Sequence, residues 1–339
     1  MQDLSVIVPT HNRRAFLPAL LASLAAQNYP ADRWELLIVD DGSSDGTRAY
    51  LETGTDPRPR QMRYIFQRQS GAATARNTGA QAATGRALLF LDDDMIAAPE
   101  LIGEHALVHQ RDPDAVVIGH LTVPPRRTEP WVAWEDAQMA RHYGQLDSGS
   151  RMPGPRDFFS GNCSVSTGLF HAIGGYNTAL TRTEDVELGY RLAAAGGSFY
   201  YRVHADSLHL GQHKFGGWVR NARIYGQADV KLGWEQGHNE LRSDVFRWFH
   251  NRRRPNRTLV QLCSAHPWLE IPLIGVLHGF GQAAYRAGKQ RPAFAAYSAI
   301  YNLVYWLALS QTLGREQFWN GVREAAPLAA GAGATRPAA

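Results

Sequence analysis

Apolar runs and helical patterns alternate along the first part of the chain. Continuous apolar runs predict buried strands, and they occur at LSVIVP (4–9), WELLIVD (34–40), MRYIF (62–66), ALLFL (87–91) and AVVIG (115–119). Residues 15–26 place their leucines on one helical face, and 71–84 form an alanine-rich helical pattern. Buried strands separated by helices predict an α/β fold with a mainly parallel sheet covered on both faces.

The regular alternation ends after the fifth predicted strand. A proline- and arginine-rich stretch, 124–130, leads into a tryptophan-containing helical segment. Residues 183–197 predict another helix, with Thr183 as its N-cap and Gly196 at its end. The run SFYYRV (198–203) then predicts one more strand. The second part of the chain is therefore expected to elaborate the sheet rather than to repeat the same unit.

Two apolar stretches, 271–285 and 292–314, follow a basic cluster near the C-terminus. The cluster consists of Arg247, Arg252, Arg253, Arg254 and Arg257. The second stretch carries no charge and is just long enough to cross a bilayer. Three placements are open: helices packed on the rest of the chain, helices lying in a membrane interface, or one membrane span. The basic cluster ahead of aromatic-rich segments favours an anionic cytoplasmic membrane surface.

Composition and charge limit the class of protein. A chain of 339 residues, 44% apolar and 19% charged, is typical of globular proteins and excludes disorder of the whole chain. Two cysteines, Cys163 and Cys263, exclude a disulfide scaffold and a cysteine-rich zinc site. A net charge of +4 is too small to indicate nucleic acid, so no such partner is expected. The N-terminal apolar run is short and follows an acid, which predicts a cytoplasmic chain rather than a signal peptide.

Carboxylates gather where the predicted strands end. Asp92, Asp93 and Asp94 follow one apolar run directly, and Asp40 and Asp41 close another. Ligands of such sheets bind beyond the carboxyl ends of the strands. Three adjacent carboxylates repel one another unless a cation neutralises them, and a hard divalent cation does so through oxygen ligands. The triplet indicates a metal site, with a solvated charge run as the plain alternative.

Other motifs are weaker when taken singly. Glu184, Asp185 and Glu187 fall in the first turn of a predicted helix, where acids complement the helix dipole; one of them could instead be a general base. His209 follows the last predicted strand and is more simply a structural histidine. Neither GxGxxG nor GxxxxGK[ST] occurs, so a dinucleotide Rossmann site and a P-loop are unsupported.

Five segments in order give the chain a specific resemblance. VIVPTHNR, VDDGSSDGT, GAATARNTGA, FLDDDM and GGYN…TEDVELGYRL are similar to the motifs of family 2 glycosyltransferases of the GT-A fold, over residues 4–215. The resemblance implies a Rossmann-like, mainly parallel central sheet with helices on both faces and a helical C-terminal extension. The expected catalytic domain covers residues 1–215. Its nucleotide-sugar half is 1–120 and its acceptor half is 121–215. The helical extension follows at 216–324, and a disordered tail at 325–339.

The resemblance also implies roles for single residues. The nucleotide-sugar is expected to contact Pro9, Thr10, Asn12, Asp41, Arg76, Asn77, Asp92 and Asp93. A divalent cation, Mg²⁺ or Mn²⁺, is expected on Asp94, with Asp92 and His209 as further ligands. Asp185 of the TED segment is the expected general base. The acceptor is expected to meet Glu184 and Trp218.

The implied reaction is inverting transfer of a sugar from a nucleotide-diphospho-sugar, with UDP favoured. The acceptor would be a saccharide or lipid-linked saccharide at the inner face of the cell membrane. Other classes stay open: a binding module that has lost catalysis, a nucleotidyltransferase, or a phosphotransferase of the haloacid dehalogenase type. The last also places D-x-D after a strand but expects Thr or Val two residues after the second Asp, where Met95 and Ile96 follow.

Overall fold

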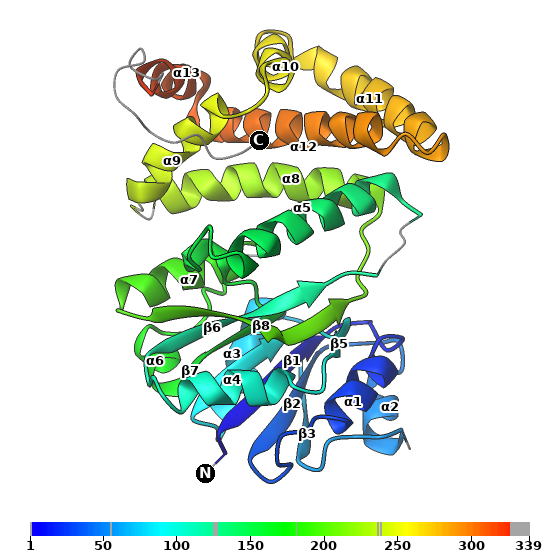
Figure 1. Ribbon diagram of the computed structural model, residues 1–339, viewed down its shortest axis with the longest axis vertical. Helices are drawn as coiled ribbons and strands as arrows, with labels where there is room; N and C mark the ends of the chain where they lie inside the picture. The colour runs from blue at the N-terminus through cyan, green and yellow to red at the C-terminus, as the bar shows by residue number, and fades with distance from the viewer. Residues whose placement is uncertain are drawn as a thin grey trace. The chain divides into compact units, whose positions relative to one another are not determined.

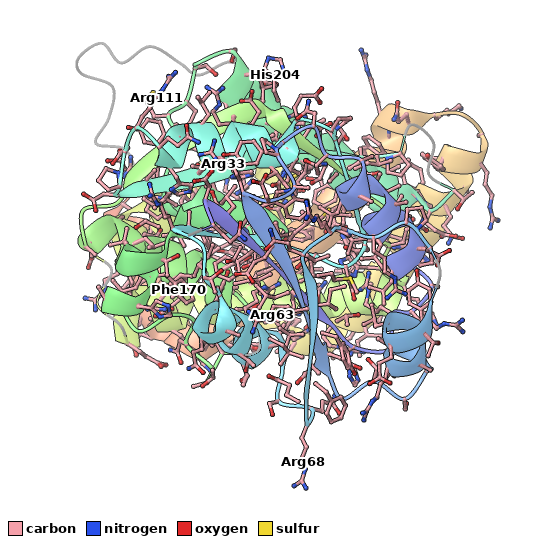
Figure 2. The ribbon with its side chains drawn as sticks, turned by 90° about the horizontal axis from the view of Figure 1, so that it is seen from below. Arg33, Arg63, Arg68, Arg111, Phe170 and His204 are labelled. Carbon is pink, nitrogen blue, oxygen red and sulfur yellow. The ribbon has the colours of Figure 1, made fainter. Side chains whose placement is uncertain are left out.

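The computed structural model describes residues 2–54, 56–124, 128–180, 182–235, 237 and 239–325 (Figure 1). The chain separates into two compact units, Met1–His213 and Lys214–Ala339. Arginine side chains such as Arg68 and Arg111 project from the surface of the first unit (Figure 2). The segment 326–339, most of the predicted disordered tail, lies outside the described residues.

The described residues of the first unit form an eight-stranded sheet in the order β3-β2-β1-β4-β7-β6-β8-β5. The strands are β1 (Leu4–Thr10), β2 (Trp34–Asp41), β3 (Met62–Gln67), β4 (Ala87–Leu91), β5 (Met95–Ala97), β6 (Ala115–Thr122), β7 (Asn162–Ser166) and β8 (Ser198–His209). β3, β2, β1 and β4 run parallel, as do β6 and β8. β7 pairs antiparallel with β4 and β6, and β5 pairs antiparallel with β8. The predicted mainly parallel sheet is confirmed.

Helices cover both faces of this sheet (Figure 1). They are α1 (Leu17–Ala25), α2 (Thr47–Thr53), α3 (Ala72–Ala82), α4 (Leu101–His109), α5 (Pro130–Asp147), α6 (Thr167–Ala172) and α7 (Glu184–Ala194), with a 3₁₀ turn η1 (Pro155–Asp157). Successive residues of β1 serve opposite faces: Val6 and Val8 join the leucines of α1, whereas Ile7 joins the core under α3 and α7. Because both faces of the sheet are buried, the strands appear in the sequence as nearly continuous apolar runs.

The small residues of α3 let that helix lie directly on the sheet. A Cβ atom at Gly79 would come within 2.5 Å of the Ile7 Cγ2 atom. A larger residue there would push the helix outward, because protein cores have no room for extra atoms. The close approach fixes the position of α3, which carries Arg76 and Asn77, two of the predicted nucleotide residues.

The structure differs from the sequence expectations at three places. β5 and β7 were not predicted as separate strands, and β8 continues beyond the predicted 198–203 to His209. Thr183 occupies the N-cap position of α7, but its hydroxyl donates to the Arg182 carbonyl rather than accepting from the helix. Its backbone is left-handed, with φ 63°, which turns the side chain away from the helix end. Gly196 does end the helix, with φ 89°.

The second unit is helical. Its elements are α8 (Phe215–Val230), a π-helical turn η2 (Lys231–Glu235), α9 (Asn239–His250), α10 (Arg254–Ala265), a 3₁₀ turn η3 (Pro267–Leu269), α11 (Glu270–Arg286), α12 (Gln290–Leu313) and α13 (Arg315–Glu324). α12 packs against α8, α10 and α11. Among the described helices α12 is long and apolar enough to cross a membrane, but 72% of its most apolar part is buried inside the molecule. α12 is therefore packed within the second unit, and a membrane contact of this region stays a prediction.

Candidate functional site

The three aspartates lie in the turn between β4 and β5, at the carboxyl end of β4. Because β1 runs parallel beside β4, the end of β1 reaches the same edge of the sheet. The Thr10 hydroxyl donates to Asp93 Oδ2 at 2.7 Å, and both residues are buried. The strand pairing thus joins the PTHN turn and the DDD turn, which lie more than eighty residues apart in the sequence.

Arg13 provides positive charge beside this acidic turn. Its Nε atom lies 2.8 Å from Asp93 Oδ1, and its guanidinium also pairs with Asp94. Arg13 was not among the residues selected from the sequence, although it belongs to the VIVPTHNR segment. Its position directly after the predicted nucleotide turn is the signal that could have found it. The pairing offsets part of the negative charge of the buried carboxylates.

His209 faces Asp94 because β5 and β8 pair in register. Met95 lies opposite His209, so Asp94 and His209 meet at the end of this short ladder. His209 Nε2 lies 3.6 Å from Asp94 Oδ2. A Cβ atom at Gly211 would lie 2.6 Å from His209 Nε2 and still closer to the Asp94 carboxylate. The space beside these two groups is open because residue 211 is glycine, a point that no sequence motif indicated.

The two buried aspartates have opposite pKa shifts. Burial raises the pKa of Asp93 to about 7, because the charges of Asp94 and Asp92 add to desolvation and outweigh Arg13 and Thr10. Desolvation also acts to raise the pKa of Asp94, but hydrogen bonding and charge from His209 and Arg13 hold it below its ordinary value. Asp94 is therefore the more dependable anion of the pair.

The donor set around Asp94 suits a cation that takes part of its ligands from elsewhere. In the part of the chain that the structure describes, no group of three or more His, Cys, Asp or Glu side chains forms a metal site. Asp94 and His209 offer one carboxylate oxygen and one imidazole nitrogen beside the space left by Gly211. Mg²⁺ is commonly held by one or two protein carboxylates, with phosphate oxygens and water completing the shell. The pair fits such a partial site.

Arg76 of α3 joins the acidic turn to the start of α7. Its Nη2 atom lies 2.8 Å from Asp92 Oδ1, and its Nη1 atom lies 3.1 Å from Glu184 Oε1. The guanidinium carbon also lies 5.5 Å from the centre of the Tyr176 ring. Asp92 is thus paired with Arg76, whereas Asp94 is paired with His209 and Arg13. A planar guanidinium can serve two carboxylates at once because its N–H groups form a fixed fork.

Asp185 stands next to this bridge, in the first turn of α7. The amide N–H of Val186 donates to its Oδ1 at 2.8 Å. Desolvation, together with the negative charge of Glu184, raises the pKa of Asp185 to about 7, while Arg76 opposes the rise. A carboxyl group with a pKa near neutrality can take and release a proton at physiological pH, as a general base must.

The remaining predicted nucleotide residues lie at the same edge but have partners within the chain. Asp41 accepts from Gln67 and from the Ser70 and Gly71 amides at 2.7–2.8 Å, just before α3 begins. Asn12 accepts from the Ser44 amide at 2.7 Å, with a left-handed φ of 53°. These contacts order the turns that follow β1 and β2.

Two further predicted nucleotide residues, Pro9 and Asn77, have different settings. Pro9 is part of β1, opposite Val39 of β2. The Asn77 amide is engaged at both ends with the Tyr176 backbone, at 2.8 and 2.9 Å. Asn77 therefore fixes the chain beside Arg76. Contacts of either residue with a nucleotide stay a prediction.

Trp218 does not suit the predicted acceptor role. Its side chain is fully buried within the second unit, and its ring packs against those of Phe215, Tyr297 and Tyr301. A tryptophan on an apolar helix face is a core residue here, because its large surface gains most from complete burial. An acceptor would have to displace this core to reach it.

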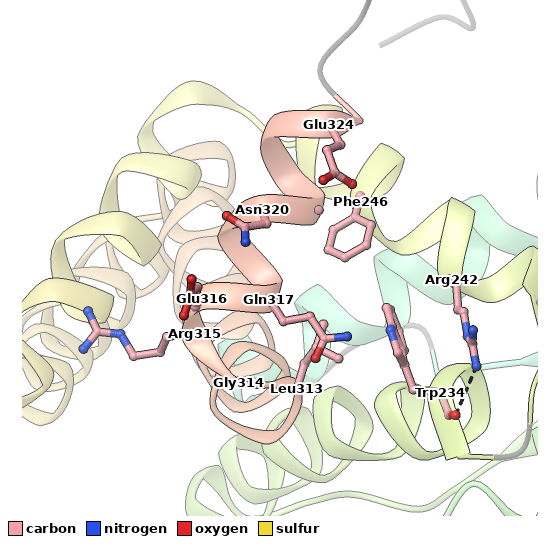
Figure 3. Close-up of a pocket in the computed structure, with 11 residues that line it drawn as sticks. Trp234, Arg242, Phe246, Leu313, Gly314, Arg315, Glu316, Gln317, Asn320 and Glu324 are labelled. Carbon is pink, nitrogen blue, oxygen red and sulfur yellow. Dashed lines mark hydrogen bonds between the residues drawn. The ribbon is translucent and has the colours of Figure 1, made fainter.

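A hollow of about 690 Å³ lies within the second unit, between η2–α9 and α13 (Figure 3). Trp234 and Phe246 lie on one side, with ring centres 5.9 Å apart. Arg242 donates to the Trp234 carbonyl at 3.1 Å, the bond drawn dashed in Figure 3. None of the predicted site residues lines this hollow, so it is not part of the candidate site.

Comparison with known proteins agrees with the fold and the motifs. The model of Glycosyl transferase family 2 matches residues 5–174, half of the chain. The chain therefore belongs to this family of glycosyltransferases, as the five motifs implied.

Validoxylamine A glucosyltransferase of Streptomyces hygroscopicus subsp. jinggangensis is 32% identical over 222 residues, covering 57% of this chain and 52% of that protein. The poly(ribitol-phosphate) beta-N-acetylglucosaminyltransferase TarS of Staphylococcus aureus is 32% identical over 119 residues, covering 35% of this chain and 21% of that protein. The chain spans about half the length, or less, of these curated relatives.

Solved structures show the same fold. The mannosyltransferase PcManGT from Pyrobaculum calidifontis, in complex with GDP-Man and Mn²⁺, has a TM-score of 0.56 at 18% identity, over 90% of this chain and 87% of that one. S. aureus TarS 1-349 in complex with UDP-GlcNAc has a TM-score of 0.55 at 14% identity, over 88% of this chain and 91% of that one. The predicted GT-A-like α/β fold is confirmed.

Proposed function

We propose that the chain is an inverting, metal-dependent glycosyltransferase that moves a sugar from a nucleotide-diphospho-sugar to a hydroxyl group of an acceptor. One observation carries the proposal: Arg76 bridges Asp92 and Glu184 at 2.8 and 3.1 Å. The bridge gathers the acidic end of β4 and the start of α7, where Asp185 has a pKa near neutrality. Donor and base chemistry would thus meet at one edge of the sheet.

The donor is proposed to be a UDP-sugar. The TarS structure holds UDP-GlcNAc, and the PcManGT structure holds GDP-Man with Mn²⁺, so proteins of this fold take nucleotide-diphospho-sugars with either base. In the proposal the donor contacts Pro9, Thr10, Asn12, Asp41, Arg76, Asn77, Asp92 and Asp93. Asp41 and Asn77 also hold backbone amides, so besides contacting the donor they would order the loops around the nucleotide.

Asp94 and His209 are the residues that would hold Mg²⁺ or Mn²⁺. The bound cation would offset the negative charge that develops on the leaving diphosphate. Arg13 compensates the Asp93 and Asp94 charges within the chain itself. Asp92 remains a candidate for a further ligand, although in this structure its carboxylate is paired with Arg76.

Asp185 is proposed to take the proton from the acceptor hydroxyl. The acceptor oxygen then forms a bond with the anomeric carbon, while the bond from that carbon to the diphosphate oxygen breaks and the nucleoside diphosphate leaves. A single displacement from the opposite face inverts the anomeric configuration and needs no covalent intermediate. Glu184 beside the base is proposed to contact the acceptor, with Arg76 fixing its carboxylate.

The acceptor is proposed to be a saccharide or lipid-linked saccharide at an anionic membrane surface, the inner face of the cell membrane. In this proposal residues 1–215 form the catalytic domain. Its donor half is 1–120 and its acceptor half is 121–215, and 216–324 is the extension. The basic cluster that begins at Arg247 supports the membrane placement.

Calorimetry tests the proposal directly. UDP, GDP and dTDP would each be titrated with Mn²⁺ and with EDTA, using the full chain. We expect binding of UDP that depends on the metal and is lost in Asp94→Ala. The matched control is Asp32→Ala, an exposed aspartate away from the site, which should bind like the parent.

Product analysis then separates the reaction from simple binding. The bound UDP-sugar should release UDP as the sugar reaches an acceptor with inverted configuration. Binding of the donor without transfer or hydrolysis would contradict the catalytic part of the proposal. Binding that is equal with Mn²⁺ and EDTA would contradict the metal.

A further inference from the structure

Large exposed apolar side chains concentrate on one helix of the second unit. Trp268 is 72% exposed, Ile271 82%, Val276 69% and Phe280 56%. We call these four residues the α11 stripe; Trp268 lies in η3, and the other three lie in α11. The three α11 members and the small residues Gly275, Gly279 and Ala283 are all exposed, and together they make up the outward half of this helix. The stripe is therefore one apolar surface and not a set of scattered side chains.

The opposite face of α11 packs into the second unit. A Cβ atom at Gly281 would lie 2.8 Å from the Tyr297 ring of α12, and the side chain of Ala284 is buried. His278 stacks on Phe215 with ring centres 3.7 Å apart. α11 is thus apolar on its outer face as well as its packed face. A helix that is apolar all round normally lies in a protein core or against lipid.

The chain segment that contains the stripe is strongly basic. Residues 251–314 contain seven Lys or Arg and a single acid, Glu270, so this segment carries more positive charge than the net +4 of the whole chain. Glu270 is buried and paired with Arg223 inside the unit. The exposed cations Arg286, Lys289 and Arg291 follow directly after the stripe. No exposed acid of the segment opposes them.

We propose that the α11 stripe docks on the surface of an anionic lipid bilayer, with the apolar side chains entering the headgroup boundary. An apolar helix face flanked by cations suits such a surface. Burial of the apolar side chains and attraction of the cations to anionic lipids both contribute to the binding free energy. A second copy of the chain suits it less, since a symmetric contact would bring the same cations together. The docking helix is α11; the longer helix α12 packs against it and is mostly buried.

Vesicle sedimentation of the full chain tests this inference without donor or acceptor, so its result is independent of the proposed transfer reaction. We expect binding to vesicles of equal parts phosphatidylcholine and phosphatidylglycerol, weakened by salt, and little binding to phosphatidylcholine alone. Ile271→Glu with Val276→Glu should weaken the binding roughly tenfold or more. Met152→Glu is the matched control, because Met152 is 79% exposed but belongs to the first unit. It should bind like the parent.

A second pair of variants examines the charge. Lys289→Gln with Arg291→Gln should weaken binding to the anionic vesicles, with a shallower dependence on salt. Arg60→Gln with Arg111→Gln removes the same charge from exposed positions of the first unit and should have a smaller effect. Equal losses in the two pairs would overturn the assignment to this face.

A labelled thiol reports the contact itself. Both native cysteines, Cys163 and Cys263, are buried, so Val276→Cys offers an exposed site for a polarity-sensitive dye. We expect a blue shift of its emission with anionic vesicles and none for the dye on Met152→Cys. An unchanged spectrum at position 276 while the chain still binds vesicles would overturn the proposal. So would a concentration-dependent dimer that is lost in Ile271→Glu with Val276→Glu.

Discussion

Asp94 and Asp185 are carboxylates of the same unit that have been placed in opposite electrostatic surroundings. Asp94 faces His209 and Arg13, whose charge and hydrogen bonding hold its pKa below the ordinary value despite burial. Asp185 has Glu184 as a neighbour, so desolvation and like charge raise its pKa to about 7. One group stays an anion, and the other exchanges a proton near neutrality. Surroundings of this kind assign different roles to identical side chains.

Arg76 links the acidic turn that contains Asp94 to the start of α7, which contains Asp185. Its guanidinium pairs with Asp92, two residues before Asp94, and with Glu184, directly before Asp185. Without it, the carboxylates of the two clusters would repel one another across the site. The comparison therefore predicts separable effects: changes at Asp185 should affect the proton, and changes around Asp94 should affect the metal and the diphosphate.

Asp185→Asn should have the largest effect. The amide keeps the shape of the side chain but cannot accept the acceptor proton, so the transfer rate should fall by about 10²–10⁴-fold. Metal-dependent donor binding should stay close to that of the parent, because Asp94 and His209 are untouched. Steady-state rates and calorimetry on the same preparation measure both. Asp32→Asn is the control for loss of one surface carboxylate, and near-parent turnover of Asp185→Asn would remove it as the base.

Arg76 variants come next, because they act on Asp185 through charge. The Arg76 cation favours the ionised form of Asp185. Arg76→Gln should therefore raise the pKa of Asp185 and move the acid limb of the kcat/KM profile to higher pH. Arg76→Lys keeps the charge but cannot bridge both carboxylates, so the rate should drop about tenfold or more with a smaller movement of the limb.

The two Arg76 variants serve as controls for each other. Circular dichroism would show that both retain the fold. If the acid limb moved equally in Arg76→Lys and Arg76→Gln, charge would not be the link between Arg76 and Asp185. If the rate dropped in both variants while the acid limb of the kcat/KM profile stayed in place, Arg76 would have only a packing role.

Gly211→Ala examines the surroundings of Asp94, the expected metal ligand. The added methyl group would collide with Asp94 and His209, so the affinity for donor with Mn²⁺ should fall about tenfold or more, with little change in EDTA. Gly168→Ala is the matched control, because a Cβ atom at Gly168 of α6 meets nothing within 4 Å. Equal donor affinity of Gly211→Ala and the parent in Mn²⁺ would show that this space is not used.

The sequence predicts the sheet well because its strands are buried on both faces. The strands β1, β2 and β4 consist mainly of buried apolar residues, so the aspartates that end β2 and follow β4 had to lie at the carboxyl edge. The three residues of β5 form too short a run to be recognised. Its pairing with β8 is what brings His209 to Asp94.

Long-range pairing and burial account for what the sequence could not supply. Arg13 meets Asp93 only because β1 and β4 are neighbours, and a lone Gly211 carries no pattern at all. Trp218 is buried although the sequence predicted an acceptor contact, since an aromatic residue on a helix has the same sequence pattern in a core as at a binding surface. For the same reason the sequence could not tell which of the two apolar stretches, 271–285 or 292–314, has an exposed apolar face, and in the structure that face belongs to α11.

The smallest expected effect is on stability, and it has the opposite sign from the effect on activity. The folded state raises the pKa of Asp185 from the ordinary value of 3.8 to about 7, so it favours the protonated form. The stability that this proton provides is complete below the unfolded pKa and is lost as the pH rises towards 7. Asparagine is neutral at every pH, so the Asp185→Asn protein does not lose this stability as the pH rises. The free energy of unfolding of Asp185→Asn, relative to the parent, should therefore increase from pH 5 to pH 8 by about 2 kcal/mol.

Urea unfolding of both proteins at the two pH values measures this difference, and titration of all other groups cancels in the comparison. Asp32→Asn should show no such dependence, because that exposed carboxyl group keeps a similar setting in both states. A relative stability of Asp185→Asn that is flat, or that falls towards pH 8, would mean that Asp185 is ionised in the folded state throughout. Asp185 and Asp94 would then both be permanent anions, and the distinction between a proton-exchanging group and a metal-holding group would be lost.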